Sequence, residues 1–532
     1  MTTLDKARGW PFVGREQELK AISSAYGSAS VHAVFLTGEA GVGKTRLARE
    51  ALRRLGGRGE WVAASSAAAQ IPFGALVHLV PDRVPVTAGS VQLMRAIGRR
   101  VRQAAVLGVD DAHLLDEASS AVIASLAGPV FVVATVRGGE GLADCLARLL
   151  RAGTARLLEV GVLPGSAMDL LIGPDRSAAE RRRLRALAAG NPLALRELLH
   201  GAAPGGLTEL MAARLAGLDP LTRRVVETIA CGEPVPLPVL ERLAGLEAVA
   251  EAESSGLIVG ERSGERAQAR LAHPLLGEVA RRRAPVARLR QVHRDLAQQL
   301  MATPMRRRDD VLRAALWQVE GGEIIWPGLV REGARLAAGR EGTALAERLA
   351  RVACEAEPGA EADRLLAEIL QYQGRTDEAT LLLPGTPPGG THERVRWTIT
   401  RAEGLYWTHG DLTGALRAYE AVKGHPLADG ARAFLLFFAG RHAETLLVAE
   451  PVLNRFESGP ETPGWSGPGR AGRRPHGPAS QAAVWAAAAA IASLGFQGRL
   501  DEALAVRVDE VPPHDDLLRE RLAADQQHPP AP

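Results

Sequence analysis

The sequence predicts an α/β domain built on a parallel sheet, followed by a long region that is almost entirely helical. Over the first 165 residues, short apolar runs at 31–37, 104–109 and 129–136 alternate with helical stretches. This alternation is typical of parallel strands with helices on both faces of the sheet. After about residue 285 the pattern is helical almost without interruption. At about 100 to 200 residues per domain, the 532 residues suit three or four domains.

Shifts in composition divide the chain into segments. Residues 1–165 form the α/β domain, 166–215 a helical lid, and 216–285 a winged-helix-like domain with a short β-rich patch. The remaining segments are a helical array over 286–510, an insert at 457–478 whose Gly and Pro content excludes a helix, and a tail at 511–532 that we expect to be disordered.

The helical array contains a loose internal repeat. In each copy, a Gly that would end one helix is followed within a few residues by a small residue in the next helix. The copies begin at Gly374, Gly410 and Gly498, and a poorer copy begins at Gly440. The first two copies lie 36 residues apart, close to the roughly 34-residue period of tetratricopeptide (TPR) repeats. We therefore expect TPR-like helix pairs, with an unspecialised helical domain as the alternative.

Charge and cysteine content exclude several classes of protein. Lys plus Arg total 64 and Asp plus Glu 61, so the net charge of +3 excludes a polybasic, histone-like protein. Cys145, Cys231 and Cys354 lack the spacing of a disulfide framework or a zinc site, so we expect ordinary reduced thiols. The N-terminus has no apolar signal region, and the longest apolar run, 482–496, is shorter than the ~20 residues of a membrane span. A cytoplasmic location is expected.

One motif carries phosphate chemistry. Glycines allow backbone N–H groups to turn toward phosphate oxygens, and the helix beginning near Lys44 would direct its positive dipole end at the same anion. Lys44 supplies a charge to the β and γ phosphates, and Thr45 a hydroxyl to Mg²⁺. The sequence therefore predicts a P-loop ATPase domain that binds ATP or ADP with Mg²⁺. The residues that match the pattern G-x-x-x-x-G-K-[ST] are Gly38, Glu39, Ala40, Gly41, Val42, Gly43, Lys44 and Thr45.

Two further strand ends supply polar partners for this loop. The run 104–109 ends in Asp110, which would hold the Mg²⁺ shell, and Asp111, which would orient or deprotonate an attacking water. Two aspartates that cap a helix are the alternative. The next run ends in Thr135 and Arg137, which would lie beside the γ-phosphate if the strand order is that of a P-loop ATPase. A solvated arginine at a strand end is the alternative.

These motifs, taken in order, resemble the large ATP-binding LuxR-type transcriptional regulators, which are members of the STAND class of AAA-related ATPases. The resemblance covers roughly residues 8–510 and is most specific before about residue 280. The motifs that carry it are Phe12-Val13-Gly14-Arg15-Glu16, the P-loop, Ile71-Pro72-Phe73-Gly74-Ala75-Leu76, Asp110-Asp111-Ala112-His113-Leu114-Leu115-Asp116, Thr135-Val136-Arg137 and Gly190-Asn191-Pro192-Leu193-Ala194-Leu195.

The resemblance implies roles for residues outside the P-loop. Val13 and Gly14 would lie against the adenine, with Arg15 nearby, and Arg137 would read the γ-phosphate. Pro192 matches the lid proline that packs on the adenine. His273 resembles the winged-helix histidine that contacts the β-phosphate of ADP, although a capping or core histidine is the alternative.

One departure from the family concerns DNA. These regulators normally end in a helix-turn-helix of about 65 residues, and no such pattern follows Ala503. The arginine runs at 181–183, 281–283 and 306–308 lie beside acidic residues and without interleaved aromatics, which favours solvated faces over nucleic-acid contacts. We therefore do not expect this chain to bind specific DNA sequences.

The function implied by the resemblance is a two-state signalling switch. ADP would hold the ATPase domain, lid and winged helix closed, and an inducer or protein on the helical array would favour exchange for ATP and self-association. Slow ATP hydrolysis would reset the switch. The alternatives are an AAA ATPase that acts on a partner, as in origin recognition, and a nucleotide-binding scaffold without DNA output.

Overall fold

The computed structural model describes most of the chain between residues 11 and 499, in two compact units. The first unit contains the parallel sheet and the helices through α15, and the second contains helices α16 to α24. The described residues are 11–56, 59–81, 84–86, 88–199, 205–263, 266–303, 305, 309–383, 390–457, 478–497, 499 and 506.

The first unit is built around a five-stranded parallel sheet in the order β2-β3-β4-β1-β5. Its strands are β1 (Ala33–Gly38), β2 (Gly59–Ala63), β3 (Val106–Asp110), β4 (Phe131–Arg137) and β5 (Ala155–Glu159). The three apolar runs predicted as strands became β1, β3 and β4, which are buried along most of their length. The two edge strands, β2 and β5, were missed because each is short, interrupted by charged residues and only partly buried.

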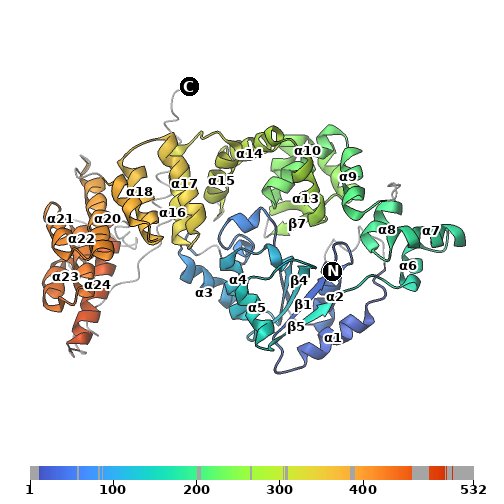
Figure 1. Ribbon diagram of the computed structural model, residues 1–532, viewed down its shortest axis with the longest axis horizontal. Helices are drawn as coiled ribbons and strands as arrows, with labels where there is room; N and C mark the ends of the chain where they lie inside the picture. The colour runs from blue at the N-terminus through green and yellow to red at the C-terminus, as the bar shows by residue number, and fades with distance from the viewer. Residues whose placement is uncertain are drawn as a thin grey trace, which may run out of the picture. The chain divides into compact units, whose positions relative to one another are not determined.

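Helices cover both faces of this sheet (Figure 1). Leu47 and Ala48 of α2 are fully buried against the sheet, which fixes the start of α2 at the end of β1. The covering helices are α1 (Glu16–Tyr26), α2 (Lys44–Leu55), α3 (Ser90–Val101), α4 (Glu117–Leu126) and α5 (Asp144–Arg151).

A helical lid and a winged-helix domain follow in the same unit. The small antiparallel sheet has the order β6-β8-β7 and packs with α10 to α13 in one core. Helices α14 and α15, which the sequence analysis placed at the start of the array, contribute Val292, Leu296 and Trp317 to that core. The elements are α6 (Gly165–Ile172), α7 (Ala178–Ala188), α8 (Pro192–Leu199), α9 (Leu207–Ala216), α10 (Pro220–Gly232), β6 (Val235–Pro236), α11 (Leu237–Ala244), α12 (Leu246–Ser254), β7 (Ile258–Ser263), β8 (Arg266–Leu271), α13 (Pro274–Arg283), α14 (Val286–Met301) and α15 (Asp310–Gly321).

The second unit is an array of paired helices, as the repeat predicted. Gly374, Gly410 and Gly440 each end a helix with a positive φ of 76°, 66° and 73°. The N–H of the next residue bonds a carbonyl of the preceding helix at 2.9–3.0 Å, five residues back after Gly374 and Gly440 and six residues back after Gly410. A five-residue bond of the same kind joins Arg499 to Leu494. Even the poorer copy at Gly440 therefore makes the same turn. The helices are α16 (Pro327–Gly339), α17 (Thr343–Ala356), α18 (Ala360–Tyr372), α19 (Thr376–Leu382), α20 (Thr391–His409), α21 (Leu412–Glu420), α22 (Pro426–Phe438), α23 (His442–Glu457) and α24 (Pro478–Phe496).

Some sequence expectations lie outside the described residues. They include nearly all of the 457–478 insert, where only the helix ends Glu457 and Pro478 are described, and the tail at 511–532. Within the part of the chain that the structure describes, no helix combines the length and the apolar character that crossing a bilayer requires.

Candidate nucleotide-binding site

The predicted phosphate loop lies between the end of β1 and the start of α2. Gly41 and Gly43 have φ values of +82° and +97°, a left-handed backbone that other residues adopt only with strain. A Cβ at Gly38 would lie 2.3 Å from the carbonyl oxygen of Val160, so glycine is required there as well. The loop therefore has the glycine-dependent curvature that directs backbone N–H groups toward one centre.

Lys44 lies at the mouth of this loop and is largely buried. Its Nζ donates hydrogen bonds of 2.8 Å to the carbonyl oxygens of Gly38 and Glu39. Burial lowers the pKa of Lys44, while the carboxylates of Asp111 and Asp110 act in the opposite direction. A buried ammonium group whose hydrogen bonds go to backbone carbonyls favours an incoming anion.

Asp110 links the P-loop to the neighbouring strand. Its Oδ1 accepts hydrogen bonds from Thr45 Oγ1 at 2.8 Å and from Thr135 Oγ1 at 2.7 Å. Burial raises the pKa of Asp110, and the two hydroxyl bonds act in the opposite direction. Neither Asp110 nor Asp111 caps a helix through its side chain, since the cap of α4 is Asp116. Asp111 occupies the N-cap position of the short 3₁₀ helix Ala112–Leu114 but makes no side-chain cap bond, so the capping alternative holds for its position and not for its side chain.

Asp111 follows in a strained backbone conformation, with φ +52°. Its N–H donates to Thr135 Oγ1 at 2.8 Å, which fixes the residue against β4. Burial and the nearby charge of Asp110 raise the pKa of Asp111 well above its ordinary value. The buried carboxyl of Glu233, from the loop before β6, adds to this rise.

Arg137, at the end of β4, does not extend freely into solvent. Its guanidinium donates to Oε2 of Glu278 on α13 of the winged helix at 2.8 Å, and Glu278 also pairs with Arg282 at 2.9 Å. Hydrogen bonding to Arg137 lowers the pKa of Glu278. The alternative of a solvated strand-end arginine is therefore wrong, and the γ-phosphate-reading candidate is held by a carboxylate of another domain.

The N-terminal segment packs beside the same loop. Arg15 is only 5% exposed and donates to the carbonyl oxygens of Val42 and Gly161 at 2.9 and 2.7 Å. Gly14 has φ +71°, and a Cβ there would lie 2.8 Å from the Cβ of Ala167 on α6. Val13 packs against the core of the lid.

The lid contacts the P-loop directly. Nδ2 of Asn191 donates to the carbonyl oxygen of Ala40 at 2.8 Å, while its Oδ1 accepts from the N–H groups of Leu193 and Ala194 and so caps α8. Pro192 is the first residue of this helix, where its lack of an N–H costs nothing. A side chain at Gly41 would collide with Asn191 and Leu193.

His273 lies in the winged helix, immediately before α13. Its Nδ1 accepts a hydrogen bond of 3.2 Å from the N–H of Leu275 and caps α13, so the capping role considered from the sequence is present. It lines a small cavity together with Leu193 and Arg214, between the lid and the winged helix.

Sequence reasoning missed the winged-helix carboxylates. Glu278 and Glu233 approach Arg137 and Asp111 from more than 100 residues away in the chain. Neither belongs to a motif, so only the packing of the winged helix on the sheet could reveal them. Arg281 was also misjudged as part of a solvated run, since it donates to Ala230 O and to Ser66 Oγ.

The described residues fit a magnesium nucleotide. The P-loop supplies a curved backbone and a buried ammonium group, and Thr45 and Asp110 place two oxygens side by side at its edge. Hydroxyl and carboxylate oxygens are ligands that Mg²⁺ prefers.

The comparisons with known proteins agree with this geometry. Residues 11–132 match the model of the AAA ATPase domain family. Lys44 at the start of α2 and Asp110 at the end of β3 lie within the matched residues, whereas Arg137, the lid and the winged helix follow them.

The fold as a whole is similar to a solved structure. A Signal Transduction ATPase with Numerous Domains (STAND) protein with a tetratricopeptide repeat sensor, from Pyrococcus horikoshii, superposes with a TM-score of 0.55 at 16% identity. The match covers 97% of this chain and 78% of that one, so the similarity of fold extends over nearly the whole of this chain. No curated protein matches the chain.

Proposed function

We propose that the chain is a nucleotide-operated signalling switch of the STAND type, resembling the LuxR-type regulators. The observation that carries this proposal is the convergence of the ATPase domain, lid and winged helix around one P-loop. Asn191 of the lid bonds Ala40, and Glu278 of the winged helix bonds Arg137. A change at the phosphates can therefore alter contacts that hold three domains together.

The residues of the site have separate roles in this proposal. Lys44 and the backbone of the P-loop bind the phosphates of ATP or ADP, and Thr45 and Asp110 hold Mg²⁺, which would supply charge neutralisation between the phosphates. Val13, Gly14, Arg15 and Pro192 border the adenine. Asp111 orients the attacking water.

Arg137 has two competing anionic partners in this scheme. In the present arrangement it bonds Glu278, and in the ATP state it would contact the γ-phosphate. Because one guanidinium cannot serve both at full strength, ATP binding would weaken the winged-helix contact. The switch then opens, exposing surfaces for self-association, and His273 would favour ADP through its β-phosphate.

The second unit would serve as the sensor, where an inducer or protein partner acts. A ligand there shifts the switch only by binding one state more tightly than the other. Output through transcription, a cytoplasmic location and the choice of partner belong to the LuxR-type resemblance. The alternatives remain an AAA ATPase that performs work on a partner and a nucleotide-binding scaffold.

Nucleotide binding provides the first test. Lys44→Ala should weaken MgATP and MgADP binding by about one to two decades, because each charge-assisted phosphate contact contributes roughly 1.5 to 3 kcal/mol. Asp111→Asn is the matched variant: it should keep nucleotide affinity, slow single-turnover hydrolysis and enrich the self-associated ATP form. Calorimetry measures nucleotide affinity, a single-turnover assay measures hydrolysis, and sedimentation measures self-association. Unchanged ATP affinity in a folded Lys44→Ala protein would contradict the assignment.

Steady-state turnover separates the switch from the second candidate function. A partner-driving ATPase should cycle within the usual enzyme range of about 1 to 10³ per second, whereas a switch can be far slower.

A further inference from the structure

One hydroxyl group connects the two aspartates at the end of β3. Thr135 lies on β4, opposite Leu36 of β1, and is fully buried at 0% exposure. Its Oγ1 donates a hydrogen bond of 2.7 Å to Oδ1 of Asp110 and accepts one of 2.8 Å from the N–H of Asp111. Because a β-branched side chain on a central strand has few rotamers, the sheet itself sets the direction of this hydroxyl.

The single proton of the Thr135 hydroxyl limits what this group can do. A threonine hydroxyl has one O–H donor and two acceptor lone pairs. In Thr135 the proton is given to Asp110, so none is left for a phosphate oxygen, which only accepts hydrogen bonds. A direct contact with the γ-phosphate, which the sequence favoured for this strand end, would need that proton. The bonds of Thr135 instead point to a role through the two aspartates.

Asp110 receives hydroxyl donors from two elements at the same oxygen. Thr45 of α2 donates to Oδ1 at 2.8 Å, beside the bond from Thr135 of β4. A hydroxyl that gives its proton to a carboxylate keeps its lone pairs for a cation, so Asp110 would aim the oxygen of Thr45 at Mg²⁺. Thr135 anchors this arrangement to the sheet. Removal of a group that holds a metal ligand in place commonly lowers metal affinity or activity by about tenfold to a hundredfold.

The second bond of Thr135 holds a strained backbone. Asp111 has φ +52°, a conformation that a residue other than glycine keeps only where its surroundings enforce it. Thr135 holds the N–H of Asp111, and the carbonyl of Asp111 accepts from the N–H of Leu114 at 2.8 Å. Loss of the Thr135 hydroxyl would therefore release the backbone at the residue that is proposed to orient water.

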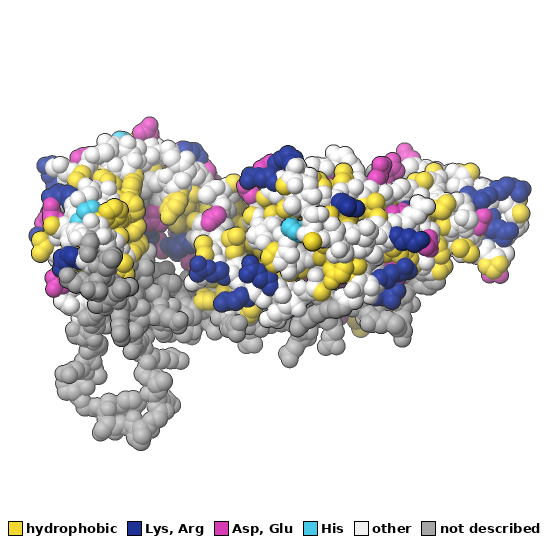
Figure 2. Space-filling model, turned by 90° about the horizontal axis from the view of Figure 1, so that it is seen from below, with side chains coloured by type: hydrophobic (Ala, Val, Ile, Leu, Met, Phe, Trp, Pro, Cys, Tyr) yellow, Lys and Arg dark blue, Asp and Glu magenta, His cyan; other side chains and the backbone are white. Residues whose placement is uncertain are grey.

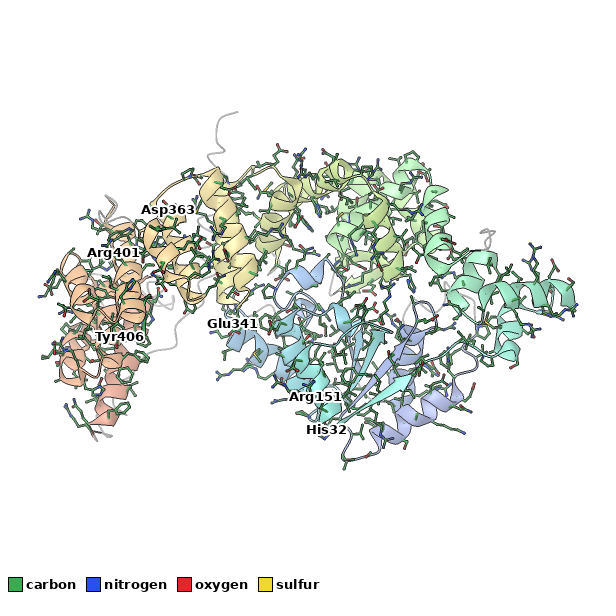
Figure 3. All side chains as sticks on the ribbon, viewed as in Figure 1. His32, Arg151, Glu341, Asp363, Arg401 and Tyr406 are labelled. Carbon is green, nitrogen blue, oxygen red and sulfur yellow. The ribbon has the colours of Figure 1, made fainter. Side chains whose placement is uncertain are left out.

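These groups lie at the carboxyl end of the strands, inside the domain. His32, which Figure 3 labels, directly precedes β1 and marks the opposite end of the sheet. Figure 2 shows an outer face of the molecule, where Lys and Arg side chains alternate with hydrophobic ones. A hydroxyl as buried as that of Thr135 adds nothing to such a surface, so its bonds act within the site.

We propose that Thr135 is a positioning residue, which holds the Asp110 carboxylate toward the Mg²⁺ position and the Asp111 backbone in the conformation for hydrolysis. This role rests on the proposed function, because it requires a nucleotide and Mg²⁺ at the P-loop. The hydroxyl contacts neither the phosphates nor the metal. Metal affinity and hydrolysis therefore depend on this group, whereas the affinity for the nucleotide itself does not.

The test replaces Thr135 of the full chain by valine, which keeps the branched shape and removes the hydroxyl. We expect ATP and ADP to bind in EDTA within about twofold of the parent affinity, because Lys44 and the N–H groups of the P-loop are unchanged. Binding of Mn²⁺ to the ADP complex, measured by electron paramagnetic resonance, should weaken about tenfold. Single-turnover hydrolysis at saturating ATP and Mg²⁺ should slow about tenfold to a hundredfold.

Three further variants separate positioning from general damage. Thr135→Ser restores the hydroxyl, so metal binding and hydrolysis should return to within about threefold of the parent. Ser120→Ala is the matched control, because Ser120 of α4 is fully buried and its hydroxyl has no partner among the residues that the structure describes. None of the three measurements should change in this control. Should Thr135→Val not fold, Thr135→Ala leaves room for the N–H of Asp111 to relax and takes its place.

The positioning role and the proposed switch can fail separately. A parent protein that binds neither ATP nor ADP would contradict the switch, and the role of Thr135 with it. A loss of ATP affinity without a loss of ADP affinity in Thr135→Val would show a direct γ-phosphate contact and overturn the positioning role alone. The same follows if Thr135→Val binds Mn²⁺ and hydrolyses ATP as the parent does, or if Thr135→Ser is as impaired as Thr135→Val. Where the parent hydrolyses no ATP, the Mn²⁺ titration decides.

Discussion

At the scale of single residues, the site depends on charges that belong to different domains. Arg137 pairs with Glu278 across the contact between the sheet and the winged helix, with both side chains about 30% exposed. An ion pair at this exposure contributes little to stability by itself, roughly 0 to 1 kcal/mol. The pair matters because Glu278 and the γ-phosphate would compete for the same guanidinium group of Arg137.

Removal of the Glu278 charge should therefore change nucleotide preference more than stability. Glu278→Gln keeps the shape of the side chain and releases Arg137, so we expect affinity for a non-hydrolysable ATP analogue to rise about two- to tenfold relative to ADP. Calorimetric titration of both nucleotides measures the ratio. Asp295→Asn, which breaks the pair between α10 and α14, is the control. An unchanged ratio would show that the pair does not oppose ATP.

Glu403 predicts a pH dependence of stability. Its folded-state pKa of about 7 lies above the ordinary value of 4.5, so the folded array holds a proton that the unfolded chain has lost between these values. Stability contributed by this residue therefore falls as pH rises from about 4.5 to 7. The charge of Glu368 of α18 acts on Glu403, and Glu403 and Arg432 of α22 both act on Tyr419 of α21.

Glu403→Gln should accordingly stabilise the array by up to about 3 kcal/mol at pH 8 and hardly at all at pH 4.5. Urea unfolding of the parent and the variant at the two pH values measures the difference, in which other titrating groups cancel. The exposed Glu355→Gln on α17 serves as the control. An equal effect at both pH values would refute the buried, protonated state of Glu403.

At the scale of elements, the helical array depends on close approaches that only small residues permit. Ala379 and Ala415, at the same place in two repeats, are fully buried where the second helix of each pair meets the first. Gly430 of α22 lies against the backbone of α24, because a Cβ there would lie 2.6 Å from the carbonyl oxygen of Ala482. These contacts explain why the repeat preserves small residues rather than a longer motif.

Gly430→Ala should loosen α22 from α24. The substitution gains about 1 kcal/mol of helix propensity but forces a backbone shift that costs about 1 to 3 kcal/mol, so the net effect is destabilising. Hydrogen exchange of the two helices should speed up. Gly495→Ala in α24 is the matched control, since nothing lies within 4 Å of a Cβ there and only the propensity gain remains. Equal exchange in both variants would contradict the close packing.

At the scale of the whole molecule, net charge limits what the chain can bind. The chain has 64 basic and 61 acidic residues, so its formal net charge is only +3. Arg281 is used inside the first unit and Arg282 pairs with Glu278, so one of the arginine runs is largely occupied by structure. The winged helix also directs α13 toward the ATPase domain through Glu278.

We therefore expect no sequence-specific DNA binding by this chain, even with ATP. Nonspecific attraction at about 10⁻⁴ to 10⁻⁶ M, reduced steeply by salt, should remain. Selection from a genomic DNA library at near-physiological salt measures this, with polyanionic heparin as competitor. Enrichment of one motif at nanomolar affinity, about 10³-fold or more above background, would show that the DNA-reading element was overlooked.

The sequence by itself determined the local parts of this protein. The spacing of Gly38, Gly43 and Lys44 after an apolar run was sufficient to place a P-loop between β1 and α2, because glycine requirements and strand burial are properties of neighbouring residues. The aspartates after β3 followed from the same reasoning. The repeat of Gly374 and Gly410 likewise fixed the turns of the array, since a left-handed helix end depends on the residue that occupies it.

Only the tertiary structure decided which distant groups meet. Glu278 reached Arg137, and Glu403 and Arg432 came to act on Tyr419, through packing between separate elements of the chain. The edge strands β2 and β5 also became strands only because a neighbour offered hydrogen bonds. Electrostatic energy depends on distance in space and on exclusion of water, and neither quantity is encoded in the spacing of residues along the chain.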